Sequence, residues 1–229
     1  MTACLHPARL ATALFLLLCS AAALAHDVSQ GDKAFVQSID GTAFIPFLYL
    51  GAKHMVTGYD HILFLIGVVF FLRRLKDIVL YVSLFTLGHS TTLLLGVLLG
   101  TGANAHFVDA IIGLSVVYKG VENIGGFRKI GLALNAGLMV LIFGLFHGLG
   151  LATKLMDLSV SENGLLVNLI GFNIGVELGQ IIVLLLVVSL LNLWRGRPSF
   201  AKYAVAANLA LIVAGLALTV YQLWEYSTS

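Results

Sequence analysis

The amino-acid sequence predicts an all-α, polytopic bundle of six transmembrane helices that follows a cleaved signal peptide. The first observation is composition: 59% of the 229 residues are hydrophobic, only 10% are charged, and the mean hydropathy is +1.00. Soluble globular domains carry about 25% charged residues. The second observation is a series of apolar stretches of about 20 residues, the length that crosses a bilayer. A net charge of +2 without a dense basic patch argues against nucleic acid as a partner.

Residues 1–25 have the pattern of a secretory signal peptide. A short basic region precedes an apolar run, and Ala23-Leu24-Ala25 forms an A-x-A cleavage site. The mature chain is therefore expected to begin at His26, and an uncleaved first helix is the alternative. The two cysteines of the chain lie within this segment, so a mature protein would have no thiol and no thiolate metal site.

Residues 26–53 are expected to form a periplasmic lead-in with a short interfacial helix, and residues 54–229 the six-helix domain. The apolar segment 42–51 is too short to span a bilayer, so it lies at the interface or folds back into the bundle. Glycine patterns at 144–148 and 171–179 predict close helix packing. The six predicted spans are 54–72, 77–100, 106–124, 130–152, 164–194 and 201–224.

Basic residues gather in every second connection between the spans. Eight of the thirteen Lys and Arg residues fall in the three segments 73–76, 128–129 and 195–202. Cytoplasmic loops carry an excess of Lys and Arg, so these segments are expected in the cytoplasm and both mature termini in the periplasm. The sequence thus predicts a multi-pass protein of the bacterial inner membrane, surrounded by the lipid bilayer.

Three histidines on three different spans are expected at a similar depth. A helical rise of about 1.5 Å per residue places His61, His89 and His147 roughly 5–12 Å below the outer surface. Asp60 directly precedes the first of them. Ionisable groups are costly in lipid and usually face a bundle interior or a site. We therefore predict that these four residues form a metal site that opens outward; a hydrogen-bonded structural network is the alternative.

The predicted donors are nitrogen and oxygen without sulfur, a set that suits Zn, Ni, Co, Fe or Cu(II). Asp60 could be a ligand, a general base, or an acceptor that orients an imidazole. His54 shares a helical face with His61 and is a further candidate ligand. His26 is another, because its terminal amine and its imidazole could chelate a metal together; a flexible terminus is the alternative.

Six other polar residues inside the spans are candidates for a pathway or for support of the metal ligands. They are Asp109, Lys119, Glu122, Asn173, Glu177 and Gln180. The last three lie at i, i+4 and i+7, so they are expected on one helix face. Glu177, about 20 Å from the outer surface, is predicted to be the next station inward from the histidines. Lys119 and Glu122 are spaced to pair within their helix or to form an inner station.

Four of these segments resemble motifs of the HupE/UreJ family of membrane proteins. The motifs are H-x3-G-x-D-H at 54–61, F-T-x-x-H-S-x-T at 85–92, F-G-L-x-H-G-x-G at 143–150 and F-N-x-G-V-E-x-G-Q at 172–180. The resemblance is closest to a less studied second branch, which usually has Glu where this chain has Asp109. It implies a nickel-permease-like or metallocentre-accessory role, by association with hydrogenase and urease maturation. The residues themselves do not select nickel over zinc.

Three functions fit these observations. The first is a divalent-metal permease or metal-delivery accessory, with metalloenzyme maturation proteins as partners. The second is an intramembrane hydrolase, in which histidine-bound zinc activates water and Asp60 and Ser90 are catalytic. The third is a non-catalytic assembly partner whose polar residues only lock the bundle.

Overall fold

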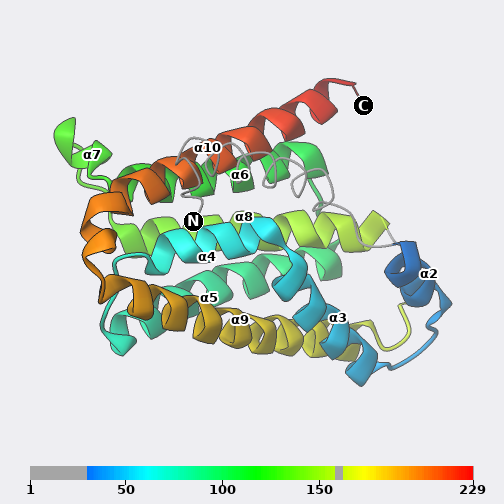
Figure 1. Cartoon of the computed structure of the whole chain (residues 1–229). Coiled ribbons are helices and arrows are strands. Elements are labelled where there is room, and N and C mark those ends of the chain that lie inside the picture. Colours follow the sequence, from blue (N-terminus) through cyan, green and yellow to red (C-terminus); the bar gives the residue numbers. More distant parts are fainter. Residues whose placement is uncertain (1–29, 158–161, 229) are drawn as a thin grey trace, which may run out of the picture.

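The computed structural model describes residues 30–157 and 162–228 (Figure 1). Within these ranges every regular element is a helix and none is a strand. The predicted signal peptide and His26 lie outside the described residues. The helices are α2 (Gln30–Ser38), α3 (Phe44–Thr57), α4 (Tyr59–Val69), α5 (Leu75–Leu99), α6 (Ala105–Asn123), α7 (Gly126–Lys129), α8 (Ala136–Asp157), α9 (Leu165–Arg195) and α10 (Pro198–Thr228).

Four helices of the described chain, α5, α8, α9 and α10, are long and apolar enough to cross a membrane. They make the chain a multi-pass membrane protein with lipid-facing apolar surface. Helix α6 has 19 residues but carries Asp109, Lys119 and Glu122. Helices α3 and α4 have 14 and 11 residues, each fewer than the roughly 20 that a straight span needs.

The first predicted span is wrong as a continuous helix, because the chain breaks at Gly58. This residue is extended, with φ −73° and ψ 99°, and it separates α3 from α4. Its N–H donates to the His54 carbonyl at 2.8 Å, and its own carbonyl accepts from the Ile62 N–H at 3.0 Å. Glycine is among the least favourable residues inside a helix, so the break falls where the helix is weakest.

The break also moves the predicted boundary between lead-in and bundle. Residues 42–51, expected to be interfacial or folded back, mostly form the first part of α3, which packs along α9. The boundary at residues 53 and 54 therefore falls inside a helix. The predicted fourth span, 130–152, begins too early, since Gly131 adopts a left-handed φ of 73° and α8 starts at Ala136.

Three closely packed helix pairs, α3 with α9, α5 with α8 and α6 with α10, build the bundle. Glycines let the backbones approach, as the glycine patterns predicted. A Cβ atom placed on Gly175 would lie 2.0 Å from the Leu48 carbonyl oxygen, and one on Gly148 would lie 2.0 Å from that of His89. Dispersion contacts between closely approaching backbones stabilise helix pairs in lipid, where no hydrophobic effect draws the helices together.

The basic connections gather at one end of the bundle, the left end in Figure 1. This basic end holds the turn between α4 and α5, the short α7 with Arg128 and Lys129, and the turn between α9 and α10. Helix α2 and the last turns of α10 lie at the opposite end. The arrangement gives the bundle two chemically different ends.

The glycine packing yields a prediction for stability. Gly175→Ala should lower the free energy of unfolding by about 1–3 kcal/mol, because the new methyl group forces α3 away from α9. Thermal unfolding in detergent measures the change. Gly196→Ala is the matched control, since a Cβ there would lie 3.8 Å from its nearest neighbours. Equal midpoints for the two variants would contradict the packing argument.

Candidate metal centre

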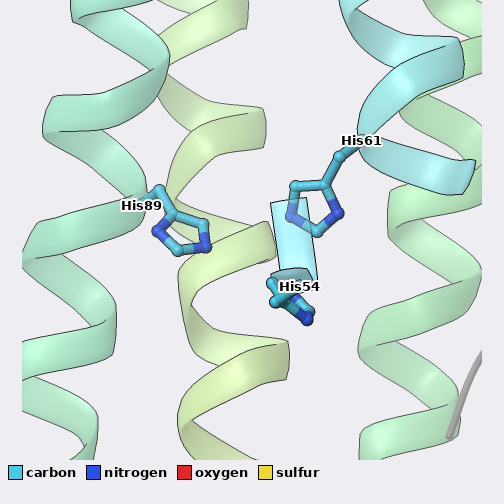
Figure 2. A group of neighbouring side chains, drawn as sticks. All are labelled: His54, His61 and His89. Atoms are coloured by element: carbon cyan, nitrogen blue, oxygen red, sulfur yellow. The ribbon is translucent and has the colours of Figure 1, made fainter. Parts of the chain in front are cut away.

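Four histidines and one aspartate from four helices face one another inside the bundle. His54 lies in the last turn of α3, Asp60 and His61 in the first turn of α4, His89 in α5 and His147 in α8. The side chains of the last three histidines are buried, with residue exposures of 2%, 0% and 1%, and Asp60 is 7% exposed. Figure 2 shows His54, His61 and His89 converging from separate helices. We refer to these five residues as the histidine cluster.

His61 is the centre of the cluster. Its ring centre lies 5.0 Å from that of His54, 5.9 Å from that of His89 and 4.9 Å from that of His147. Two sets of three residues each bring one ligand atom per residue within 4.8 Å of the others, namely His54 with His61 and His89, and Asp60 with His61 and His147. Ligands on one zinc ion lie about 3–4 Å apart. The atoms of either set are therefore at most about 1–2 Å farther apart than ligands on one ion would be.

Five imidazole nitrogens of the cluster are buried without a hydrogen-bond partner in the described part of the chain. They are Nε2 of His54, His61 and His147, and both ring nitrogens of His89. A buried polar group left unpaired costs about 1–3 kcal/mol. Such a concentration of unpaired nitrogens is what a nitrogen-ligated metal would satisfy.

Hydrogen bonds at Nδ1 hold the rings of His61 and His147 in position. Nδ1 of His61 lies 3.0 Å from Oδ1 of Asp60, and Nδ1 of His147 lies 2.7 Å from the Phe143 carbonyl oxygen. A proton on each Nδ1 makes these hydrogen bonds and leaves the Nε2 lone pair for a metal. Carboxylates and carbonyls orient metal-binding histidines in this way.

Aromatic rings enclose the cluster. The Phe85 and Phe64 ring centres lie 5.0 Å and 5.3 Å from that of His147, and the Phe172 ring centre lies 6.0 Å from that of His54. An apolar shell limits the access of water and lowers the local dielectric constant, which strengthens the interaction between a cation and its ligands.

Gly58 leaves the space in which the cluster forms. A Cβ atom on this residue would lie 2.9 Å from Nδ1 of His61 and 3.1 Å from Oδ1 of Asp60. The chain also changes direction at this residue, between the end of α3 and the start of α4. His54 and His61 therefore meet across a bend, and not along one helix face as the sequence predicted.

The predicted polar residues of α6 belong to neither set of candidate ligands. Asp109 is buried and pairs with Lys154 of α8 at 2.8 Å between Nζ and Oδ2. Lys119 and Glu122 form an ion pair with each other, in agreement with their spacing. Both line a separate cavity near the basic end.

The three predicted residues of α9 do not share one environment. Asn173 and Gln180 are buried, whereas Glu177 is exposed. At about 100° per residue, Glu177 lies roughly 60° from Gln180 around the helix, which is enough to place it at the edge of the buried stripe. The expectation that Glu177 lies directly inward of the histidines is therefore corrected.

Glu177 lines a groove between α5 and α9 with a volume of about 690 Å³. Thr86, Ser90 and Gln180 also line it, and none of the described histidines does. The Thr86 hydroxyl donates to Oε1 of Gln180 at 2.9 Å. Ser90, predicted as a catalytic candidate beside His89, thus belongs to this groove.

Sequence reasoning missed the enclosing phenylalanines and the partner of Asp109. Phe85 and Phe143 each precede a cluster histidine by four residues, and Phe64 follows one by three, so each shares a helix face with its histidine. That spacing was the available signal. The partner of Asp109 is Lys154, whose side chain reaches across from α8 to α6.

Comparison with known protein families adds one finding. Residues 30–228 match the family model described as HupE / UreJ protein. No curated protein and no solved structure is significantly similar to the chain.

Metal binding should depend on His61. His61→Ala removes the ligand common to both sets, so purified protein should lose at least tenfold of its affinity for Ni²⁺ or Zn²⁺. Elemental analysis after dialysis and isothermal titration measure the loss. His106→Ala is the control, because His106 bonds Gln222 at 2.9 Å between α6 and α10. Identical metal content in the two variants would refute the predicted site.

Metal binding should also depend on the space at residue 58. Gly58→Ala introduces a methyl group against His61 and Asp60, so affinity should fall several-fold while the helical content stays unchanged. Titration and circular dichroism measure the two quantities. Unchanged affinity in a folded Gly58→Ala protein would show that the cluster does not require this space.

Proposed function

Because the chain belongs to the HupE/UreJ family, we propose that it is a membrane permease for a divalent transition metal. The observation that carries the proposal is the histidine cluster, with five unpaired imidazole nitrogens in the bundle interior. Neutral imidazole is the commonest nitrogen ligand of transition metals. The cargo would bind there first, after entering from the end opposite to the basic end.

A purely structural role for the cluster is less well supported. A hydrogen-bonded network stabilises a bundle only when its members satisfy one another. In the cluster, His89 has no hydrogen-bond partner for either nitrogen among the described residues. A metal-binding role accounts for these nitrogens, and an assembly role does not.

The proposed topology has six crossings, with α3 and α4 together forming one bent crossing and α6 another. Helix α6 can carry its three ionisable residues because Asp109 pairs with Lys154, and Lys119 with Glu122. The basic end faces the cytoplasm and both mature termini face the periplasm of a bacterial inner membrane. A signal peptide ending at residue 25 completes the proposal.

Nickel is the first cargo to test, because the family resemblance associates the chain with nickel-enzyme maturation. The histidine and carboxylate donors suit zinc equally well. Maturation proteins of hydrogenase or urease would be the partners that receive the metal, and an accessory role in metal delivery fits the same site.

An intramembrane zinc hydrolase is the second candidate. Oδ1 of Asp60 lies 3.0 Å from the His61 ring nitrogen, so its carboxylate could serve as a general base beside a bound metal. Ser90 gives no additional support, since it lines the groove between α5 and α9. The permease therefore accounts for more of the site.

Uptake into proteoliposomes tests the proposal. Proteoliposomes that contain the protein and a nickel-sensitive dye in their lumen should take up Ni²⁺ or Zn²⁺ at least tenfold faster than vesicles without protein. The reason is that the histidines replace the hydration shell of the ion. His61→Ala should abolish the difference and His106→Ala should keep it. Tight metal binding without any flux would contradict a permease and favour a hydrolase or an accessory protein.

A further inference from the structure

Three helices repeat the same order of side chains along the bundle axis. On α4, Phe64 follows His61 by three residues; on α5 and α8, a phenylalanine precedes the histidine by four. Helix α4 runs towards the basic end, whereas α5 and α8 start there (Figure 1). Each phenylalanine therefore lies about one turn closer to the basic end than its histidine.

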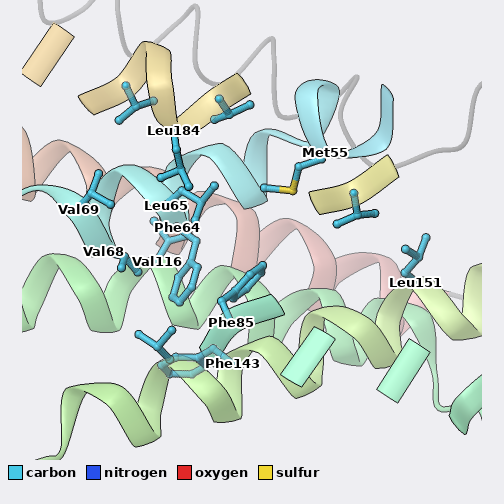
Figure 3. Close-up of a cluster of buried hydrophobic side chains, with 14 of the residues drawn as sticks. Met55, Phe64, Leu65, Val68, Val69, Phe85, Val116, Phe143, Leu151 and Leu184 are labelled. Atoms are coloured by element: carbon cyan, nitrogen blue, oxygen red, sulfur yellow. The ribbon is translucent and has the colours of Figure 1, made fainter. Parts of the chain in front are cut away.

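Phe64, Phe85 and Phe143 lie near one another in the core, and we name them the phenylalanine layer (Figure 3). The Phe64 ring centre lies 5.3 Å from that of Phe85 and 5.9 Å from that of Phe143. Their exposures are 0%, 1% and 8%. The layer contacts the histidines directly, with 5.0 Å between the ring centres of Phe85 and His147.

A cavity of about 760 Å³ lies on the other side of this layer, at the basic end. We name it the inner vestibule. Its wall includes Val68, one turn beyond Phe64, and Tyr81, one turn before Phe85. Tyr118 of α6 also lines it, and its ring centre lies 5.2 Å from that of Phe143. Along α4 and α5 the phenylalanine layer therefore lies between these walls and the cluster.

The inner vestibule offers a carboxylate to a cation that passes the layer. Glu122 lines it and is paired with Lys119. The neighbouring Asn123 amide donates to the Gly67 carbonyl at 2.9 Å and to Oδ1 of Asn208 at 2.8 Å, which fixes this end of α6 against α4 and α10. A cation could replace Lys119 as the partner of Glu122.

We propose that the phenylalanine layer is the inner gate of the metal path and that Glu122 is the next ligand behind it. The proposal rests on the permease function. A dry aromatic constriction opposes a divalent ion because the ion would lose its hydration without gaining ligands, and such constrictions gate channels by excluding water. Rotation of one or two rings would join the cluster to the inner vestibule.

Flux measurements on gate variants test the proposal. Phe85→Ala and Phe143→Ala should each raise downhill Ni²⁺ flux at least fivefold in dye-loaded proteoliposomes. Metal should still bind the cluster in Phe143→Ala, because the backbone carbonyl that accepts from His147 remains. Phe70→Ala is the matched control, because Phe70 is 2% exposed but stacks on Phe200, with ring centres 5.7 Å apart, outside the layer. If the flux through the two gate variants equals the flux through Phe70→Ala, the proposed gate is wrong.

A second pair of variants distinguishes the route. Glu122→Gln should lower flux at least fivefold, and Glu177→Gln should leave it unchanged. The reverse result would assign the path to the groove between α5 and α9 and overturn the proposal. If wild-type protein shows no His61-dependent flux at all, the permease function itself fails; normal wild-type flux with neutral gate variants rejects the gate alone.

Thiol access gives a measurement that requires no gate substitution. The only cysteines are Cys4 and Cys19, so replacing both with Ser yields a background without thiols. In it, the Ala136→Cys variant places a thiol in the wall of the inner vestibule. A membrane-impermeant thiol reagent should react at least tenfold faster from the basic end than from the opposite end. Equal rates from both sides overturn the closed layer.

Discussion

The arrangement of the cluster depends on the break at Gly58, because this residue sets how α3 meets α4. An unbroken helix would carry His54 and His61 two turns apart, about 10 Å along the axis. The extended backbone at Gly58 brings their ring centres to 5.0 Å. The glycine contacts between α3 and α9 then hold α3 in this direction, since the Leu48 backbone fits against Gly175 without a side chain between them.

The helix pairs place the remaining histidines of the cluster by the same means. Gly148 of α8 admits the backbone of His89, so α5 and α8 approach closely at the level of the cluster. His89 and His147 can therefore both approach His61 of α4. The packing of small residues thus also determines where the cluster histidines lie, and a change that separates the helices should also disperse their nitrogens.

The sequence predicted the long helices well, because runs of 20 or more apolar residues have few alternatives in a membrane. It also identified the histidines, because an ionisable side chain within a span is costly and usually faces the bundle interior or a site. It missed the break, because the spacing of His54 and His61 fits one face of a continuous helix and a single glycine between them does not by itself end a helix. It misplaced Glu177 because a 40° step from Asn173 separates a buried side chain from an exposed one.

The interior of the bundle combines the histidine cluster with the phenylalanine layer, and the two differ in what they offer a cation. Unpaired nitrogens are costly beside apolar rings, and phenylalanines offer a divalent ion no ligand. In the proposed permease, direct contact between the layers, with 5.0 Å between the ring centres of Phe85 and His147, would hold a bound ion next to the gate. Stability alone would favour apolar residues at both levels. The proposed holding and release of a cation accounts for imidazole nitrogens next to an aromatic layer, whereas stability by itself does not.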